Sequence, residues 1–592
     1  MFVSSPLFSA IRLPATASQL RALLQARGLL VVLLAVVVGV VAGVLVTAMS
    51  QFVQFLHWLL FNTPPGGRLS AMLALGNPLQ AAMPALGGLL LGLSIFWLRW
   101  RKFRTPVDPI EANALHGGRM SLTDTCIIAG QTMLSSGFGA SVGLEAGYTQ
   151  VGSGFASFLA RFFRLRRSDI RILVGCGAAG AIAAAFDAPL TGAFYGFELI
   201  IGIYSIANVA PVMAAAISAA LVTNWLGGVP FPIELPHLPE LTASQYVPFI
   251  VLGLIGGVLS IALMYLVAGV ERGFAKLAIP QAVRPFVGGC LVGLLGLLSP
   301  QVLSSGHGAL HTVFQLDHSL AFIAGLFALK VAASALSLGA GFRGGLFFAS
   351  LLLGALLGRI FAGLITFAGP LFSIDPGVAA VAGMTSMAVG IVGGPLTMTF
   401  LALESTRDLA LTGVVLATSI MTSILVRETF GYSFSTWRFH LRGETIRSAQ
   451  DVGWIRNLTV ATMMRKDAET IDASTTVSAF CAKFPLGATQ RVIAIDENGH
   501  YAGMLLVADV HAHDAQASVP VSDLAKHKGT VLVPAMDASI AAAAFQQADA
   551  EELAVIRSVN DPVVIGLLTE SHLMRRYAEE LEKVRRDLAG EK

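Results

Sequence analysis

Residues 189–198 read PLTGAFYGFE and residues 395–404 read PLTMTFLALE, so one ten-residue pattern occurs twice in the chain. Each copy begins with Pro-Leu-Thr and ends, after six further residues, with a glutamate, Glu198 or Glu404. Both copies lie in apolar surroundings that glycine and proline interrupt. Internal duplication of this kind is typical of membrane transporters built from two related halves. The pattern therefore predicts a repeat whose halves enclose a functional site.

Glycines upstream extend the repeat. Gly177 and Gly383 lie at the same distance before the two prolines. Farther upstream, Gly143-Leu144 and Gly345-Leu346 each precede a further glycine by the same interval. The alternative is chance similarity between helices rich in Gly, Ala and Leu, which membrane proteins often contain. Two matches in the same order make duplication the stronger interpretation.

Composition also indicates a membrane protein. The chain is 55% hydrophobic and 13% charged, about half the charged share of an ordinary soluble domain. Its first apolar run, residues 29–49, is long enough to cross a bilayer and longer than the core of a signal peptide. Arg12, Arg21 and Arg27 precede this run and predict a cytoplasmic N-terminus. The net charge of +3 gives no indication of a nucleic-acid partner, and the four cysteines have neither metal-ligand nor disulfide spacing.

Many apolar segments are too short to span a bilayer alone, and breaks such as Asp108-Pro109, Gly344-Gly345 and Gly394-Pro395 separate them. Non-helical backbone at membrane depth is tolerated where it is buried in protein or lines an aqueous path. We therefore expect an all-α polytopic membrane domain of broken, tilted helices around a pathway. The apolar segments are residues 29–58, 81–99, 122–136, 146–163, 171–186, 189–205, 209–225, 246–270, 285–299, 320–338, 345–368, 377–391, 396–404 and 409–426.

From about residue 443 the sequence reads like a soluble α/β domain. A pattern of one helix and two strands occurs twice, and the tail from Glu570 is charged and helical. The predicted helix and strands of the two units are Val477–Phe484, Arg491–Asp496 and Met504–Val507, then Ile540–Gln547, Leu553–Val559 and Val563–Leu568. The predicted domains are a cytoplasmic N-terminal segment at 1–27, a membrane domain at 28–440, a linker at 441–456 and a cytoplasmic domain at 457–592.

Helix N-termini are the expected anion-binding groups. Their backbone N–H groups and the helix dipole attract anions. One N-terminus contributes about 0.3–2 kcal/mol, whereas dehydrating an ion costs several kcal/mol, so several N-termini must converge. Small or proline residues lead into apolar helices at residues 105–109, 141–145 and 343–348. The alternative is that their glycines only permit tight helix packing; three such starts around the repeat favour an anion site.

Glu145 is the sharpest single candidate. It lies at a predicted helix start in an apolar region, where an ionisable side chain is costly and usually functional. Its carboxylate would compete with an anion for the N–H groups and would lose that attraction on protonation, which are the properties of a gate. The alternative is a glutamate that only caps its own helix. Glu198 and Glu404 are predicted to be structural, bonding backbone or a basic partner where the halves meet, and Lys330 and Arg343 to be interface or snorkelling residues.

These residues together resemble the CLC family of chloride channels and chloride/proton antiporters. The family's Gly-Arg-Glu-Gly-Pro motif is similar to residues 143–147, Gly-Ile-Phe-Ala-Pro to residues 345–349, and Gly-Ser-Gly-Ile-Pro to residues 105–109. The resemblance covers residues from about 28 to 440. It implies that Glu145 is the gate and that the protein is a homodimer with one pore per subunit. The anion-binding residues that it implies are Thr105, Pro106, Val107, Gly345, Leu346, Phe347 and Ser435.

The sequence departs from the family motifs at three positions. The anion-coordinating serine falls on Pro106, or on Thr105 with a one-residue shift, and proline there accompanies a nitrate preference in some relatives. The coordinating tyrosine falls on Ser435, with Tyr432 close by. The inner proton-transfer glutamate falls on Leu199, which cannot relay a proton. That change favours passive conduction, although protons can also cross on water.

The soluble tail resembles a pair of CBS repeats, at about 457–512 and 521–577. The resemblance implies an adenine-nucleotide site as one possibility. Asp509 in the first unit and Thr569 in the second match its pattern, while their partner positions, Leu506 and His572, do not. A purely structural or dimer-stabilising role is the alternative.

The combined prediction is a bacterial inner-membrane protein with both termini in the cytoplasm. It would carry chloride through a passive, voltage- or pH-dependent pore gated by Glu145. The alternatives are an anion/proton antiporter, with or without a nitrate preference, and a membrane-embedded enzyme. The twelve histidines form no metal-ligand pairs in the apolar region, which counts against an enzyme. No cofactor or metal is expected, and the substrate is a small inorganic anion.

Overall fold

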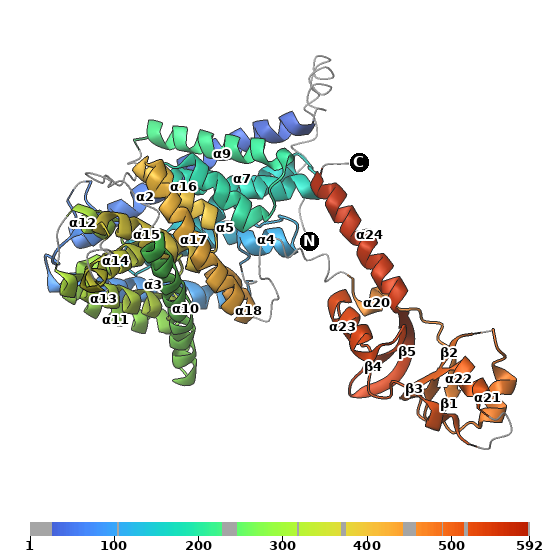
Figure 1. Ribbon diagram of the computed structural model, residues 1–592. Helices are drawn as coiled ribbons and strands as arrows, with labels where there is room; N and C mark the ends of the chain where they lie inside the picture. Colours follow the sequence, from blue (N-terminus) through green and yellow to red (C-terminus); the bar gives the residue numbers. More distant parts are fainter. Residues whose placement is uncertain are drawn as a thin grey trace, which may run out of the picture. The chain divides into compact units, whose positions relative to one another are not determined.

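The computed structural model describes residues 27–64, 66–103, 106–227, 246–315, 319–368, 374–441, 458–487, 489–513 and 519–589. The chain divides into two compact units, Met1–Asp451 and Val452–Lys592 (Figure 1). This division falls inside the predicted linker. Residues 442–457, which make up most of that linker, and the predicted N-terminal segment up to residue 26 lie outside the described residues.

Every named element in the described part of the first unit is a helix, as predicted, and eight of these helices are long and apolar enough to cross a membrane. The principal helices are α2 (Arg27–Phe61), α3 (Met83–Trp100), α4 (Pro109–Leu115), α5 (Leu122–Gly137), α6 (Glu145–Phe162), α7 (Arg167–Phe186), α8 (Pro189–Tyr195), α9 (Ile206–Trp225), α10 (Tyr246–Lys276), α11 (Arg284–Leu298), α12 (His307–Gln315), α13 (Leu320–Gly339), α14 (Phe347–Ile365), α15 (Pro376–Val392), α16 (Pro395–Thr406), α17 (Leu409–Thr429) and α18 (Phe434–Leu441).

Each predicted apolar segment is helical in the structure, and the breaks fall where the sequence places proline. Pro189 and Pro395 are the first residues of α8 and α16. Proline lacks a backbone N–H, and at this first position of a helix no intrahelical hydrogen bond needs one. Asp375 and Asp408 cap α15 and α17 by accepting backbone N–H bonds. The short helix α12 was not among the predicted segments.

The two halves pack their helices in the same order. α6 packs against α7 as α14 packs against α15, and α2 packs against α9 as α10 packs against α17. The halves meet where α3 contacts α11 and where α8 contacts α16. The predicted repeat is therefore a structural repeat.

The glycines that extend the repeat in the sequence allow equivalent close helix crossings. A Cβ atom added at Gly177 of α7 would lie 2.3 Å from the carbonyl oxygen of Gly152 in α6. In the second half, a Cβ added at Gly383 of α15 would lie 2.3 Å from the carbonyl oxygen of Gly354 in α14. No larger residue fits at such a separation, so these four glycines are packing residues.

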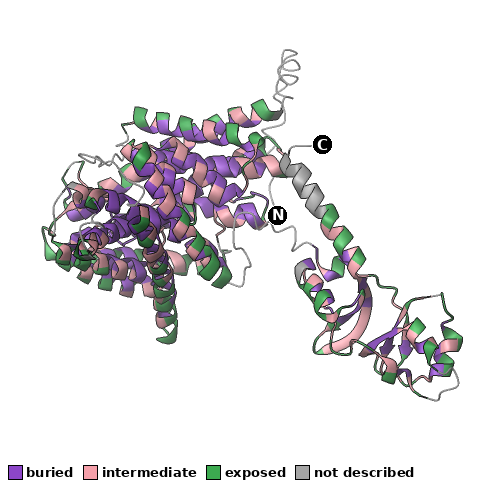
Figure 2. Ribbon diagram, in the orientation of Figure 1, coloured by how far each residue is buried: buried purple, intermediate pink, exposed green. Residues whose placement is uncertain are grey.

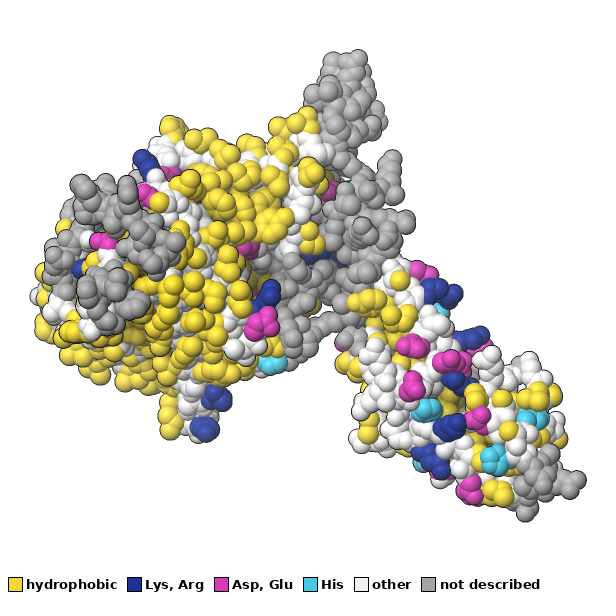
Figure 3. All heavy atoms as spheres, in the orientation of Figure 1, with side chains coloured by type: hydrophobic (Ala, Val, Ile, Leu, Met, Phe, Trp, Pro, Cys, Tyr) yellow, Lys and Arg dark blue, Asp and Glu magenta, His cyan; other side chains and the backbone are white. Residues whose placement is uncertain are grey.

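The inner helices of this unit are more buried than the outer ones. Most of α7 and α14 is buried, whereas large apolar side chains such as Leu33, Phe96 and Leu294 are exposed on the outer helices (Figure 2). Hydrophobic side chains cover much of the surface of this unit in the view of Figure 3. An exposed apolar surface of this extent suits contact with lipid rather than water.

The second unit is an α/β domain with two similar halves, each with its own apolar core. Strand β1 pairs parallel with β2 and β2 pairs antiparallel with β3, while β4 pairs antiparallel with β5. The six predicted helices and strands and the helical tail are confirmed, and β1 was not predicted. The elements are α20 (Val460–Met463), β1 (Thr470–Asp472), α21 (Val477–Lys483), β2 (Arg491–Ile495), β3 (Tyr501–Leu506), α22 (Val507–Ala512), α23 (Ala538–Ala548), β4 (Glu552–Ser558), β5 (Asp561–Thr569) and α24 (Glu570–Ala589).

Candidate functional site

Two of the three predicted helix starts lie side by side. Gly143 and Gly345 exchange backbone hydrogen bonds, with N···O distances of 2.9 and 3.1 Å, and form an isolated antiparallel bridge. Directly after this bridge, α6 begins at Glu145 and α14 begins at Phe347. The bridge therefore brings two helix N-termini from the two halves of the repeat to one place.

A cavity of about 140 Å³, here called the central cavity, lies at this meeting point. Four helices begin at its wall: α4 at Pro109, α6 at Glu145, α14 at Phe347 and α18 at Phe434. The first N–H groups of a helix have no intrahelical partner, and the helix dipole makes them attractive to anions. The central cavity therefore suits a small anion.

Glu145 is buried beside these N-termini, with 4% of its surface exposed. Its own backbone N–H and that of Phe348 are close enough to interact with the carboxylate. Its Oε2 atom accepts no hydrogen bond from a described residue. A Cβ atom added at Gly345 would lie 3.2 Å from Oε2, and one added at Gly143 would overlap it. The two glycines thus leave the space that the carboxylate occupies.

Glu145 also stands between two cavities. A second cavity of about 170 Å³, here called the Arg68 cavity, is lined by Arg68, His57 and His307 among other residues. Glu145 is the only described residue that lines both this cavity and the central cavity. Its carboxylate therefore occupies the point at which a path between them would have to pass.

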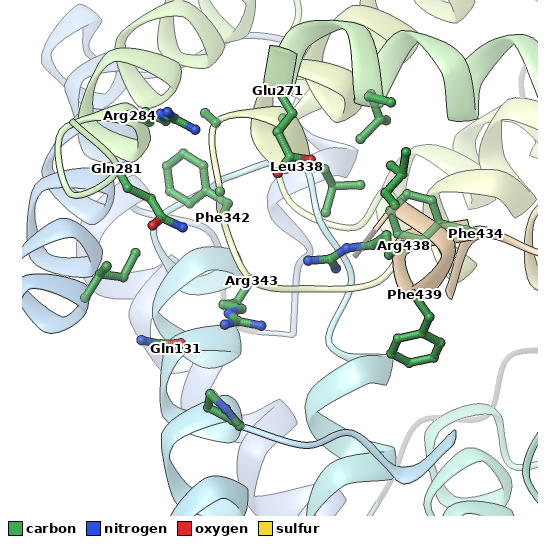
Figure 4. Close-up of a pocket in the computed structure, with 18 of the residues that line it drawn as sticks. Gln131, Glu271, Gln281, Arg284, Leu338, Phe342, Arg343, Phe434, Arg438 and Phe439 are labelled. Atoms are coloured by element: carbon green, nitrogen blue, oxygen red, sulfur yellow. The ribbon is translucent and has the colours of Figure 1, made fainter. Parts of the chain in front are cut away.

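A third cavity, here called the Arg343 cavity, has a volume of about 480 Å³. Arg343, Arg438 and Glu271 project into it from the loop before α14, from α18 and from α10 (Figure 4). Phe434 and Arg438 line both this cavity and the central cavity. The first turns of α18 are therefore the wall between them.

The third predicted start, residues 105–109, contributes different residues from those expected. Thr105 lies outside the described residues. Pro106 lines the Arg343 cavity and not the central cavity, and the Val107 carbonyl oxygen accepts a hydrogen bond from Gln150 at 3.1 Å. Asp108 and Pro109 line the central cavity instead. The nitrate alternative depended on Pro106 contacting the anion, and this placement leaves it without support.

Asp108 adds a carboxylate to the central cavity that the sequence analysis did not place there. Its Oδ1 atom accepts the backbone N–H of Glu111 at 2.9 Å and so caps α4. One N–H of this N-terminus is therefore already used by a carboxylate of the same loop. The cavity therefore has a second acidic side chain besides Glu145, and one basic side chain, Arg438, also lines it.

The other predicted residues, Gly345, Leu346, Phe347 and Ser435, all line the central cavity. The structure places an unexpected tyrosine there. Tyr195 lines the cavity and its side chain hydrogen-bonds with Thr149, whereas Tyr432 contacts His440 at 3.1 Å and does not line the cavity. Tyr195 lies inside the repeated stretch, at the position of Leu401 in the second copy, so this difference between the copies was the available signal.

Glu198 and Glu404 have the structural role that was predicted. Glu198 accepts the N–H groups of Leu396 and Thr397 at 3.0 and 2.8 Å and the Thr397 hydroxyl at 2.6 Å. Glu404 accepts the equivalent groups of residues 190 and 191 at 2.8, 2.8 and 2.7 Å. Each glutamate therefore caps the Pro-Leu-Thr helix of the opposite half.

Lys330 is not a snorkelling residue. Its side chain is fully buried, and its Nζ atom donates to the carbonyl oxygens of Val302 and Ser304 at 3.0 and 2.8 Å. Arg343, in contrast, faces the large cavity named after it.

In the second unit, each of the two predicted nucleotide-binding residues forms an ion pair or a hydrogen bond with a neighbouring residue. Asp509 pairs with the Lys526 Nζ atom at 2.6 Å, and the Thr569 hydroxyl accepts the backbone N–H of His572 at 3.2 Å. A cavity of about 940 Å³ lies between β3 and β4, and neither residue lines it. Several acidic residues, including Glu552, whose pKa is raised by burial, line this cavity.

The geometry agrees with comparisons to known proteins. The family model for the voltage gated chloride channel matches residues 87–427. The chain is 28% identical to the voltage-gated ClC-type chloride channel ClcB of Salmonella typhi over 399 residues, which covers 67% of this chain and 95% of that protein. It is also 28% identical to a putative ClcB-like chloride channel protein of Ralstonia nicotianae, over 62% of this chain and 86% of that protein.

Solved structures show the same fold at low sequence identity. A slow cyanobacterial Cl−/H+ antiporter aligns with a TM-score of 0.60 and 22% identity, covering 70% of this chain and 97% of that chain. A eukaryotic CLC transporter aligns with a TM-score of 0.58 and 17% identity, covering 92% and 97%. With the matching family model, the repeat and the central cavity identify this chain as a member of the CLC family, an integral membrane protein of anion transport.

Proposed function

We propose that Glu145 gates the passage of a small anion, chloride in the first place, between the central cavity and the Arg68 cavity. The observation that carries this proposal is the position of Glu145. Its carboxylate lies beside two helix N-termini, and among the described residues it is the one that lines both cavities. A carboxylate there competes with an anion for the same N–H groups. Protonation removes its charge and therefore its advantage in that competition.

Passive conduction is the favoured mode. Leu199 follows the capping glutamate Glu198 and is buried, so it offers no titratable group at that place. Proton-coupled exchange is the second candidate, because Asp108 and Tyr195 bring further titratable groups to the central cavity beside Glu145. The solved relatives named Cl−/H+ antiporter and fluoride/proton antiporter support this candidate, whereas the ClcB relatives are named channels.

The remaining assignments follow from the resemblance. We infer a homodimer with one pore per subunit in a bacterial inner membrane, with both termini in the cytoplasm, and a CBS-type regulatory role for the second unit. Nucleotide binding by that unit stays a prediction. Loading with ATP or AMP, followed by thermal unfolding of the full chain, measures it directly.

The gate is tested by reconstituting the full-length protein in liposomes under a chloride gradient while external pH is recorded. We expect chloride flux that rises as pH falls, because protonation releases the carboxylate. Glu145→Gln should carry chloride with no pH dependence, whereas Glu428→Gln, which changes an exposed glutamate outside all three cavities, should behave like the wild type. Proton uptake against its gradient would establish exchange. A pH dependence that persists in Glu145→Gln would refute the gate.

A further inference from the structure

The turn between α6 and α7 concentrates positive charge at one end of the first unit. Residues 161–171 contain five arginines and a single acidic residue, Asp169. Four of these arginines are exposed, namely Arg161, Arg164, Arg166 and Arg167. None of them lines the central, Arg68 or Arg343 cavity, so the gate does not account for this charge.

A loop that precedes α5 brings a fifth exposed arginine to the same place. The Arg161 guanidinium donates to the Met120 carbonyl oxygen at 2.8 Å, and the Ser157 hydroxyl donates to the Gly118 carbonyl oxygen at 2.7 Å. These bonds hold the loop against the end of α6 and place the exposed Arg119 beside Arg161. The five exposed side chains are here called the arginine patch: Arg119, Arg161, Arg164, Arg166 and Arg167.

The described part of the chain compensates little of this charge. The side chains of Arg119, Arg164 and Arg167 form no hydrogen bond or ion pair with a described residue. Arg166 is the N-cap residue of α7 and provides no side-chain cap. Positive side chains at the start of a helix oppose the helix dipole, so this arrangement is unfavourable without a counter-charge. The arginine patch therefore favours an anionic partner outside the chain.

Exposed aromatic side chains beside the arginine patch indicate what kind of anion this partner carries. Phe158, Phe162 and Phe163 lie at the end of α6, and Phe162 is 71% exposed. The ring centroids of Phe158 and Phe162 lie 6.4 Å apart and those of Phe162 and Phe163 5.4 Å apart, so the rings form one row. Such a row suits an anion that has an apolar part, because aromatic side chains collect at the level of lipid headgroups. A free inorganic anion would have no use for it.

The arginine patch also lies where a membrane surface is expected. Helix α7 is a candidate span and begins at Arg167, within the patch. Two earlier candidate spans, Gly28–Phe61 and Pro78–Trp100, return the chain to the side on which α2 begins, and no described span lies between Trp100 and the loop before α5. With the cytoplasmic N-terminus proposed above, the patch faces the cytoplasmic leaflet, whose anionic lipids attract basic segments next to the membrane.

We propose that the arginine patch, together with the phenylalanine row, binds an anionic phospholipid of the cytoplasmic leaflet. The phosphate of the headgroup lies against Arg164 and Arg167, and an acyl chain lies along Phe162. The bound phosphate supplies the counter-charge that the turn between α6 and α7 lacks, so the lipid stabilises this turn. The proposal does not assume that anions pass Glu145, and it uses only the proposed orientation of the N-terminus to name the leaflet.

Thermal unfolding of the full-length protein in mixed micelles tests this site. We expect phosphatidylglycerol to raise the unfolding temperature of the wild type and phosphatidylcholine, which has no net charge, to leave it unchanged. In the double variant Arg164→Gln/Arg167→Gln, the phosphatidylglycerol fraction that gives half of the shift should rise about tenfold, because two of the attracting charges are gone. The matched control is Arg272→Gln/Lys276→Gln, which removes two exposed basic side chains near the end of α10 and should respond like the wild type.

Inorganic phosphate separates a lipid from a free anion. It should not reproduce the shift at the same concentration, and an equal shift would mean that the arginine patch binds a soluble anion instead. Phe162→Ser should weaken the response to phosphatidylglycerol, because it removes the contact with the acyl chain. Equal responses of the double arginine variant and the wild type to phosphatidylglycerol would overturn the site.

A structural measurement covers the case in which the double variant does not fold. Electron cryo-microscopy of the wild-type protein in nanodiscs that contain phosphatidylglycerol should show headgroup density beside Arg164 and Arg167. A patch without such density would overturn the proposal. Absence of chloride flux through the wild type would refute the proposed function and leave these lipid measurements unchanged, so the two failures are distinguishable.

Discussion

At the scale of single residues, we expect the Asp108 carboxylate to weaken the binding of an anion in the central cavity. Its carboxylate lines the cavity and caps α4 through the Glu111 N–H at 2.9 Å. Asparagine caps helices as well as aspartate does but carries no charge. Removing a charge repulsion on the order of 1–2 kcal/mol should strengthen chloride binding roughly tenfold in Asp108→Asn. Isothermal titration calorimetry of the detergent-solubilised protein measures this affinity.

Asp108→Ala separates the two roles of this residue. This substitution removes both the negative charge and the helix cap. It should therefore lower the free energy of unfolding by about 1 kcal/mol, and it should also remove the repulsion between residue 108 and the bound anion. Chloride affinity in Asp108→Asn equal to that of the wild type would mean that the carboxylate points away from the bound anion.

At the scale of elements, the crossing of α6 and α7 positions the gate, because Glu145 is the first residue of α6. In Gly177→Ala, the new methyl group would meet the Gly152 carbonyl oxygen at 2.3 Å and force the helices apart. Overpacking of this kind costs about 1–3 kcal/mol. We expect a lower unfolding temperature in detergent, measured by the loss of the monodisperse peak in size-exclusion chromatography after heating.

Gly273→Ala is the matched control for that substitution. Gly273 lies near the end of α10 and has no atom within 4 Å of an added Cβ. Alanine favours helix by about 1 kcal/mol over glycine, so this variant should be as stable as the wild type or more stable. Equal unfolding temperatures for the two variants would show that the crossing tolerates a wider separation.

Elements were also the level at which the sequence was most informative. The ten-residue repeat and its upstream glycines predicted the paired helices and the meeting of the α6 and α14 starts, because proline and glycine act locally on the backbone. The same reasoning could not place Tyr195 or Arg68 beside Glu145. Their positions depend on how segments from different parts of the chain fold together, and nothing in their immediate neighbours encodes that. The sequence predicted Pro106 at the central cavity, and the structure places Asp108 there instead. This difference also depends on how the loop packs against other segments, because a shift of two residues along the loop turns another side chain towards the cavity.

At the scale of the whole molecule, the two units have separate cores and separate cavities. The apolar clusters of the second unit contain only residues from Leu458 onward. Every described residue that lines the central, Arg68 and Arg343 cavities lies before residue 442. No described residue of the second unit lines these cavities, so we expect this unit to affect transport by altering the first unit.

A chain truncated after Asp451 should consequently fold and carry chloride. Its flux should keep the dependence on pH, and Glu145→Gln in the truncated chain should abolish that dependence as it does in the full chain. Liposome flux assays on the four proteins, full-length and truncated, with and without the substitution, measure both effects. Truncated protein that is stable in detergent but inactive would show that transport requires the second unit. The gate would then have to depend on contacts from outside the membrane unit.

A changed rate with the same pH dependence is the result expected if the second unit is regulatory. Regulation alters how often the path opens, whereas Glu145 determines how a proton opens it.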